Sequence, residues 1–167
     1  MAETSNGETQ LVVFALDKEE FACNIMDVSE VLKMVKATPL PRSLDFVEGV
    51  INLRGEVIPV IDLRKRFGLQ EVEKTDDSRI IIVEVEKRMV GLIVDSVSEV
   101  IRMPEKNIQD SPEKVAGAHT DLIMGVGKVN DRLLIILDLK RILSTEEQIA
   151  LDDAASAGRQ AVKDSDY

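Results

Sequence analysis

The chain has 167 residues, a formal net charge of −10 at pH 7 and a sequence pI of about 4.7. Nucleic acids and anionic membrane surfaces are bound mainly through basic patches, so this charge argues against both as partners. There is no apolar run near the ~18 residues of a membrane helix, and the opening MAETSNGETQ lacks the features of a signal peptide; we therefore expect a cytoplasmic protein without direct membrane insertion.

Apolar residues make up 44% of the chain, whereas aromatic residues make up only 3% and Trp is absent. The apolar residues are mostly Ile, Val and Leu, a composition that favours strands. Two short strands are predicted first, over 11–16 and 21–25, with a charged turn between them. The single cysteine, Cys23, alternates with Phe21 and Ile25 in the second strand. A thiol in that position is predicted to belong to the core.

A short helix is predicted after these two strands. Asp27 and Glu30 have the capping-box spacing, and Ser96 and Glu99 repeat it further along the chain. One apolar stripe with helical spacing supports the first of these helices: Val28, Val31, Leu32 and Val35.

A hairpin is predicted next, with strands over 46–53 and 57–61. Its turn is placed at Arg54 and Gly55, a pair that suits a tight reversal. Asp62 then caps a last helical turn. This turn carries the one basic cluster of the chain, interpreted as a solvated strand end: Arg64, Lys65 and Arg66.

The chain contains an internal duplication. Residues 11–34 align without a gap on 80–103 at an offset of 69, and the segment Val-Ser-Glu-Val is identical in both. Residues 49–66 align on 125–142 at an offset of 76, with Gly-Val and Asp-Leu shared. Two similar segments in the same order indicate one small fold made twice.

The two halves are predicted at about 8–75 and 76–143, each with four or five short strands. Sheets of this size bury their faces and hide their edges best by curling into barrels. Beyond them, a capped helix is predicted over 144–157. The ends of the chain, 1–7 and 158–167, are polar and are predicted to be flexible tails.

No catalytic signature is found. His119, the only histidine, lies in a predicted loop with no Ser or Cys nucleophile set beside it by sequence. Asp62 and Asp138 occupy equivalent places in the two halves, which leaves a metal-dependent hydrolase as a weak alternative. A nucleic-acid-binding small barrel is a second alternative, disfavoured by the acidic charge and the few aromatic residues.

The stretch GVINLRGEVIPVIDLRKRFG over 49–68 resembles the hallmark segment of the CheW-like domain family. The strongest part is Asn52-Leu53-Arg54-Gly55 followed by PVIDLR. The resemblance extends over about 8–157 and includes the two VSEV segments, so the whole range is identified as a single CheW-like domain.

This resemblance implies a mainly β fold of two SH3-like five-stranded barrels with short helices between strands and a C-terminal helix. It also implies a non-catalytic adaptor of bacterial chemotaxis, with no cofactor and no metal. The implied partners are the regulatory domain of the CheA histidine kinase and the cytoplasmic tip of a methyl-accepting chemoreceptor.

The candidate protein-binding residues lie in the first half of the chain. We expect Val28 and Leu53 to act as apolar anchors, and Glu30 and Arg54 to lie within reach of each other at the rim of a groove between the barrels. Asn52 is expected to help orient these groups. Gly49 and Gly55 are expected to serve the backbone geometry of turns.

Overall fold

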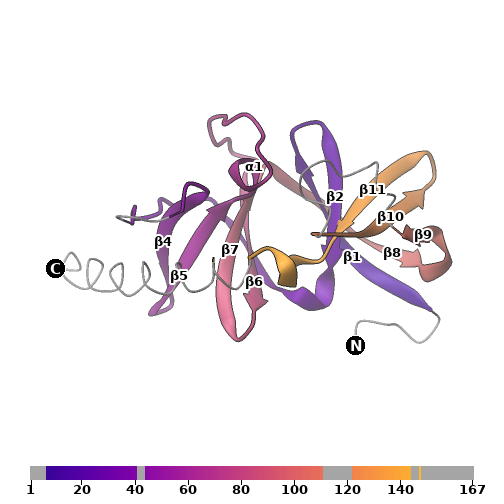
Figure 1. The fold of residues 1–167 in the computed structure, drawn as a ribbon, viewed down its shortest axis with the longest axis horizontal. Coiled ribbons are helices and arrows are strands. Elements are labelled where there is room, and N and C mark those ends of the chain that lie inside the picture. The colour runs from indigo at the N-terminus through magenta and orange to yellow at the C-terminus, as the bar shows by residue number, and fades with distance from the viewer. Residues whose placement is uncertain (1–6, 41–43, 111–121, 144–146, 148–167) are drawn as a thin grey trace.

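The computed structural model describes residues 7–40, 44–110, 122–143 and 147. Its strands form two curled sheets that lie side by side (Figure 1). The six-stranded sheet has the order β8 (Ser96–Pro104), β1 (Glu8–Leu16), β2 (Glu19–Asn24), β11 (Arg132–Leu137), β10 (Ile123–Val129) and β9 (Ile108–Asp110). The five-stranded sheet has the order β3 (Val28–Lys33), β6 (Arg79–Val85), β7 (Arg88–Val94), β5 (Glu56–Asp62) and β4 (Val47–Leu53).

The two halves of the chain exchange hairpins, which the sequence analysis did not predict. The first hairpin, β1–β2, belongs to the six-stranded sheet with β8–β11, whereas β6–β7 belongs to the five-stranded sheet with β3–β5. The exchange is made by two antiparallel pairings, β1 with β8 and β3 with β6, and by two parallel pairings, β2 with β11 and β5 with β7. The expected halves, 8–75 and 76–143, are therefore repeats of sequence, but neither of them forms a barrel by itself.

Three apolar cores hold this arrangement together. One core fills the inside of the six-stranded barrel and includes Leu11, Val13 and Met103. A second fills the five-stranded barrel and includes Ile58 and Ile80. The third and largest lies between the barrels. Every strand except β9 supplies it with residues that are either buried in it or packed against it. Each side of these curled sheets thus buries apolar side chains at some point along the strands.

The segment predicted as a helix from Val28 is strand β3, so that prediction was wrong. Its exposure alternates along the strand, and β3 pairs with β6 through Leu32 opposite Ile80. The equivalent segment is also a strand, β8. The helical stripe was misleading because Val28 and Leu32 fit a period of two as well as a period of 3.6. Pairing with a neighbouring strand overrides the weak local preference.

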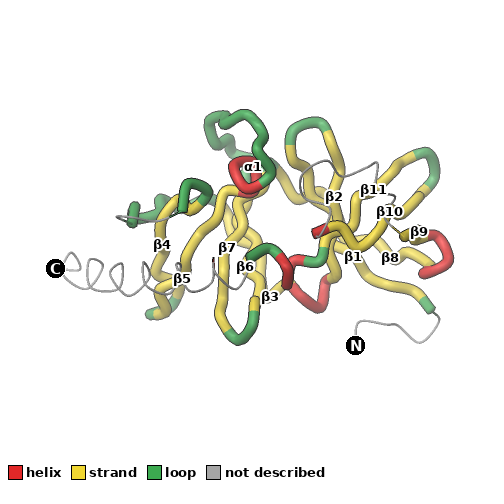
Figure 2. The backbone as a smooth tube through the Cα atoms, viewed as in Figure 1, coloured by secondary structure: helices red, strands yellow, loops and turns green. Residues whose placement is uncertain are grey.

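Short helices do connect strands where the chain turns. They are the 3-10 turns η1 (Ile25–Asp27), η2 (Glu105–Asn107) and η5 (Leu139–Arg141), and the single α-helical turn α1 (Leu63–Arg66). Asp62 caps α1 as predicted, because its Oδ1 accepts a hydrogen bond of 2.9 Å from the Arg64 backbone N–H. Asp138 caps η5 in the same way through the Lys140 N–H at 3.1 Å. Figure 2 shows these turns in red between the yellow strands.

Several predicted features lie outside the described residues: the helix 144–157 apart from Glu147, both flexible tails except residue 7, and the loop that holds His119. Within the part that the structure describes, no helix is long and apolar enough to cross a membrane.

Candidate protein-binding surface

Glu30 and Arg54 form a bidentate ion pair, so they lie within reach of each other as the sequence analysis expected. Arg54 Nη1 donates to Glu30 Oε1 at 3.3 Å, and Arg54 Nη2 donates to Glu30 Oε2. Glu30 belongs to β3 and Arg54 to the turn after β4, and these are the two outermost strands of the five-stranded sheet. The ion pair therefore joins the two edges of that sheet at one mouth of the barrel.

The pair is accessible to a partner. The Arg54 side chain is 71% exposed and that of Glu30 is 30% exposed. The hydrogen bond from Arg54 lowers the pKa of Glu30, and the same bond raises the pKa of Arg54. Both groups are therefore charged at neutral pH, and they offer a fixed pattern of donors and acceptors at the surface.

Asn52 holds the turn that presents Arg54. Its side-chain oxygen accepts a hydrogen bond of 2.9 Å from the Gly55 backbone N–H. Arg54 and Gly55 have φ values of 51° and 88°, so the chain reverses through two left-handed residues as a tight hairpin requires. The interaction of Asn52 inside the protein is thus with the backbone of this turn, and its side chain is otherwise exposed.

Val28 and Leu53 are half-buried and pack into two different cores. Val28 packs against the core between the barrels, whereas Leu53 packs against the core of the five-stranded barrel. Neither side chain is strongly exposed. Their packing against the cores is a structural role, and it leaves only part of each side chain open to a partner.

Gly49 and Gly55 meet two different needs of the backbone. A Cβ atom on Gly49 would overlap the carbonyl oxygen of Thr38, whose backbone exchanges hydrogen bonds of 2.8 Å with Val50. Gly49 therefore permits a close approach of two chain segments, where the sequence analysis expected a turn. Gly55 has open space around it and supports the hairpin turn through its positive φ.

A groove of about 780 Å³ lies where the two barrels meet. The five-stranded barrel contributes Ser29, Glu84, Glu86 and Lys87, and the six-stranded barrel, with the turns that adjoin it, contributes Asn24, Met26, Asp27, Met124, Asp138 and Lys140. Met26 and Met124 are 66% and 55% exposed. Flexible methionines that are open to solvent and bordered by charges suit a protein partner that inserts apolar side chains.

The sequence analysis missed both methionines. Met26 lies in a 3-10 turn and Met124 in a strand that was predicted only by alignment with the first half, so no periodicity marked either as exposed. Ser29 borders this groove, whereas its neighbour Glu30 points to the other side of β3 and joins Arg54 at the barrel mouth. The groove and the ion pair therefore meet β3 at neighbouring residues but on different sides of the strand, and neither Glu30 nor Arg54 lines the groove between the barrels.

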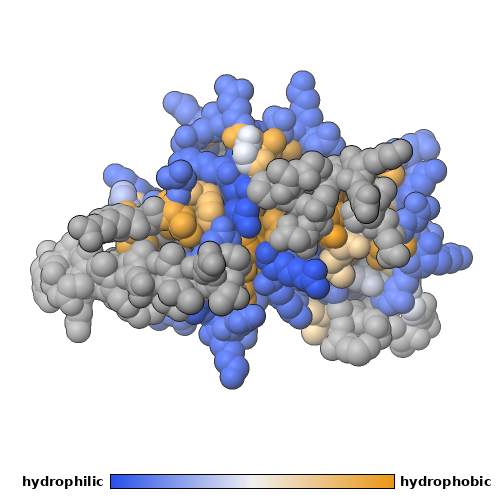
Figure 3. All heavy atoms as spheres, in the orientation of Figure 1, coloured by the Kyte–Doolittle hydropathy of each residue, from blue (hydrophilic) through white to orange (hydrophobic). Residues whose placement is uncertain are grey.

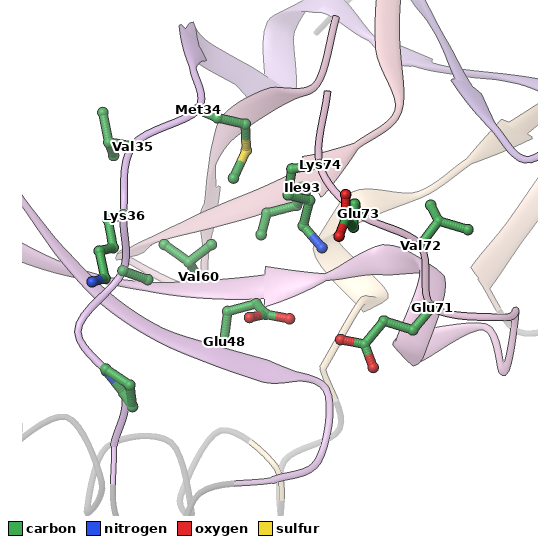
Figure 4. Close-up of a pocket in the computed structure, with 12 residues that line it drawn as sticks. Met34, Val35, Lys36, Glu48, Val60, Glu71, Val72, Glu73, Lys74 and Ile93 are labelled. Carbon is green, nitrogen blue, oxygen red and sulfur yellow. The ribbon is translucent and has the colours of Figure 1, made fainter. Parts of the chain in front are cut away.

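A second groove, of about 650 Å³, crosses the five-stranded barrel (Figure 4). Val60 and Ile93 form its floor, Val35 and Val72 lie at its sides, and Glu48, Glu71 and Lys74 supply charges. Figure 3 shows apolar residues exposed over this barrel, in a surface that is otherwise mostly hydrophilic at its ends and turns.

The basic run 64–66 is not a free basic patch, which corrects its interpretation as solvated. Arg64 is only 8% exposed. Lys65 pairs with Glu48 at 3.2 Å and with Glu71 at 3.4 Å, and Arg66 donates to the Ile142 carbonyl at 3.0 Å. The basic side chains of this run are therefore paired with groups of the protein itself.

The two aspartates considered for a metal site also have structural partners. Besides capping α1, Asp62 pairs with Lys74 at 3.0 Å, and Asp138 lies 3.5 Å from Arg141. No cluster of three potential metal-ligating side chains occurs among the described residues. The geometry gives no support to the hydrolase alternative.

Comparison with known proteins then identifies the family. The family model described as "CheW-like domain" matches residues 10–147, which takes in every strand of both barrels apart from the first two residues of β1. The chain belongs to the CheW family. It is thus a scaffold protein of chemotaxis and not an enzyme.

Relatives of the same kind cover nearly the whole chain. The Chemotaxis protein CheW of Bacillus subtilis is 41% identical over 92% of this chain and 99% of its own length. That of Klebsiella aerogenes is 34% identical over 90% and 93%. The solved structure of the scaffolding protein TtCheW from Thermoanaerobacter tengcongensis superposes with a TM-score of 0.78 at 44% identity, covering 83% of this chain and 94% of that one. The two-barrel fold of a CheW protein is thereby confirmed.

Proposed function

We propose that this CheW-family protein couples methyl-accepting chemoreceptors to the CheA histidine kinase through protein–protein contacts alone. The observation that carries the proposal is the family match over 10–147, together with a surface that has an exposed ion pair and a groove in which methionines are bordered by charges. The relative from Thermoanaerobacter tengcongensis is named a scaffolding protein, and we extend that role to this chain.

The surface on and around β3 is the proposed docking region. Glu30 and Arg54 present paired charges at the mouth of the five-stranded barrel, and Met26 and Met124 offer apolar contact area in the groove that reaches β3 at Ser29. An amphipathic helix, such as the tip of a chemoreceptor, places apolar side chains in a groove and polar side chains along its rim. The kinase regulatory domain would then use a different part of the surface, since one scaffold must hold both partners at once.

The proposed place of action is the cytoplasmic side of membrane receptor arrays, with no cofactor, no nucleic acid and no insertion into the lipid. The net charge of −10 supports this, because it is unfavourable toward anionic lipids and nucleic acids.

Calorimetric titration of the purified protein with a CheA regulatory domain tests the proposal. Binding should be detected and should be unchanged by ATP or by a metal chelator. Absence of binding to the regulatory domain, or phosphotransfer by this chain alone, would contradict the adaptor role.

A further inference from the structure

The chain passes between the two barrels twice in the described residues. It first crosses after β2, through η1, to reach β3, and it returns after β7, through Asp95, to reach β8. The two crossings occupy equivalent places in the duplication. Because the barrels share no sheet, the contacts at these crossings and the core between the barrels determine how firmly one barrel is held against the other.

The second crossing is fixed by a dense polar network. Arg64 donates from Nε to Asp95 Oδ1 at 2.8 Å, from Nη2 to Asp95 Oδ2 at 2.6 Å, and from Nη1 to the Gln70 carbonyl at 2.8 Å. Asp95 Oδ2 also accepts a hydrogen bond of 2.7 Å from the backbone N–H of Asp17, in the β1–β2 turn of the six-stranded barrel. A guanidinium held in this way by a planar carboxylate has little freedom to reorient.

The first crossing has a single, weaker ion pair, and its acidic residue is one position further along than Asp95 is in the second crossing. Lys140 occupies the place of Arg64 in the duplicated sequence, and it lies 3.7 Å from Asp27 with its own side chain 67% exposed. A lysine ammonium is a flexible point charge, and exposed ion pairs of this length contribute little to stability. Between described residues, no hydrogen bond from the Lys140 side chain is found at this crossing, and the contact with Asp27 is an ion pair only.

The backbone hydrogen bonds also differ between the two crossings. The Asp95 N–H donates to the Ala15 carbonyl at 3.0 Å and extends the β1–β8 pairing into the crossing. Met26 is the equivalent of Asp95 at the first crossing, but its N–H donates to the side chain of Asn24, two residues away, at 2.9 Å. The β3–β6 pairing correspondingly ends at Val28 opposite Val83.

Apolar support does not explain the difference, because it is alike at both crossings. Leu63 of α1 and Leu139 of η5 are equivalent residues, and both are buried in the core between the barrels at 0% and 1% exposure. The two crossings are thus matched in their apolar contacts and unequal in their polar ones.

We propose that the crossing at Arg64 and Asp95 is a fixed hinge and that the crossing at Lys140 and Asp27 is a labile latch. The groove beside Met26 and Met124 is lined by Asp27 and Lys140 themselves, so release of the latch changes its width. The barrels rotate about the Arg64 side while their shared apolar core stays closed. This inference concerns the motion of the protein alone and holds whether or not the proposed coupling function is correct.

Distances between spin labels, measured by pulsed EPR on the full chain, test the proposal. One pair, Glu84→Cys with Met124→Cys, spans the groove on the latch side. The matched pair, Lys18→Cys with Glu71→Cys, spans the hinge side, and all four positions are exposed. Cys23 can be retained, because burial, with a smaller contribution from Asp27, raises its pKa to about 12 and leaves little reactive thiolate.

The distance distribution should be broader across the groove than across the hinge. Equal widths, or a broader distribution on the hinge side, would overturn the proposal. The variant Arg64→Lys keeps the positive charge but loses the guanidinium that donates two hydrogen bonds to Asp95, so it should broaden the hinge-side distance distribution. The variant Asp27→Asn should leave the hinge-side distribution unchanged. If the Arg64→Lys variant folds and the width of its hinge-side distance distribution is unchanged, the proposal is also overturned. If that variant does not fold, the comparison of the two label pairs in the protein with Arg64 intact decides.

Discussion

The ring of Phe21, in β2 of the six-stranded barrel, stacks on the ring of Phe67, which ends helix α1 beside the five-stranded barrel. Their centroids are 5.9 Å apart and their planes differ by 20°. The ring of Phe14 also stacks on that of Phe21, with their centroids 5.9 Å apart and their planes 18° apart. In a chain with only four phenylalanines and no tryptophan, three of them thus form one column across the junction of the barrels.

Replacing Phe21 or Phe67 by leucine should lower the free energy of unfolding, since each change keeps most of the apolar volume and removes the ring contact. A double-mutant cycle should give a coupling energy of about 0.5–1.5 kcal/mol, the usual value for stacked aromatic pairs. Urea unfolding of the two single variants and the double variant measures it. Strict additivity would show that the column contributes only buried area.

Gly49→Ala should destabilise the fold strongly, because the new Cβ atom would overlap the Thr38 carbonyl and break the Thr38–Val50 bridge. We expect a loss above ~2 kcal/mol, in the range caused by overpacking and a lost backbone pairing. Gly55→Ala is the matched control: it also places Ala at positive φ but meets open space, and it should cost about 1 kcal/mol. Equal losses in thermal or denaturant unfolding would contradict the close-approach explanation.

Asp95 should make stability depend on pH in the acid range. Burial alone would raise its pKa, but the hydrogen bonds from Arg64 and from the Asp17 N–H outweigh burial, and the pKa of Asp95 lies below its ordinary value of 3.8. The unfolded chain therefore takes up this proton first as the pH falls. The contribution of Asp95 is complete above the unfolded-state pKa and is lost as the pH falls through the lower folded-state pKa.

Asp95→Asn should accordingly be less stable than the unmodified protein near neutral pH, and the difference should shrink as the pH falls below about 4. Denaturant unfolding at a series of pH values measures this. A difference that stays constant down to the acid limit would show that Asp95 acts without its charge.

The charges of Glu30 and Arg54 should matter for binding more than for stability. Glu30→Arg or Arg54→Glu should change thermal unfolding little, because the pair is exposed, yet each should weaken partner binding by placing like charges at a rim. The double swap should recover part of that loss. Arg54→Asn serves as a control, since Asn tolerates the left-handed φ of 51° and removes the guanidinium and its hydrogen bonds to Glu30 without placing a like charge beside Glu30. Full binding by both single variants would remove this pair from the docking surface.

The sequence predicted part of the local chemistry correctly, although the capping boxes at Asp27 and Ser96 fall at strands β3 and β8. The turn at Arg54 and Gly55, the capping by Asp62, the buried Cys23 and the contact of Glu30 with Arg54 are all found in the structure. Each depends on residues close in sequence, or on one short step across a small barrel, where local geometry decides the outcome.

The hairpin exchange and the hinge could not be predicted in the same way. Both halves carry nearly the same strand pattern, so the hairpin β1–β2 could bury its apolar face against either half. Four strand pairings between the halves decide the outcome: β1 with β8, β2 with β11, β3 with β6 and β5 with β7. The role of Arg64 was equally hidden, because Asp95 lies 31 residues away and nothing in its neighbourhood marks it as a partner. Long-range pairing of this kind is set by the packing of the whole molecule.

The central claim, that this protein is the scaffold that links receptor to kinase, is tested most directly by reconstitution. CheA kinase is mixed with vesicles that contain a chemoreceptor, with and without this chain, and the kinase that sediments with the vesicles is measured. Our account predicts that receptor-bound kinase forms only when the chain is present, and that the Glu30→Arg variant supports less of it. Equal amounts of receptor-bound kinase with and without the chain would contradict the account.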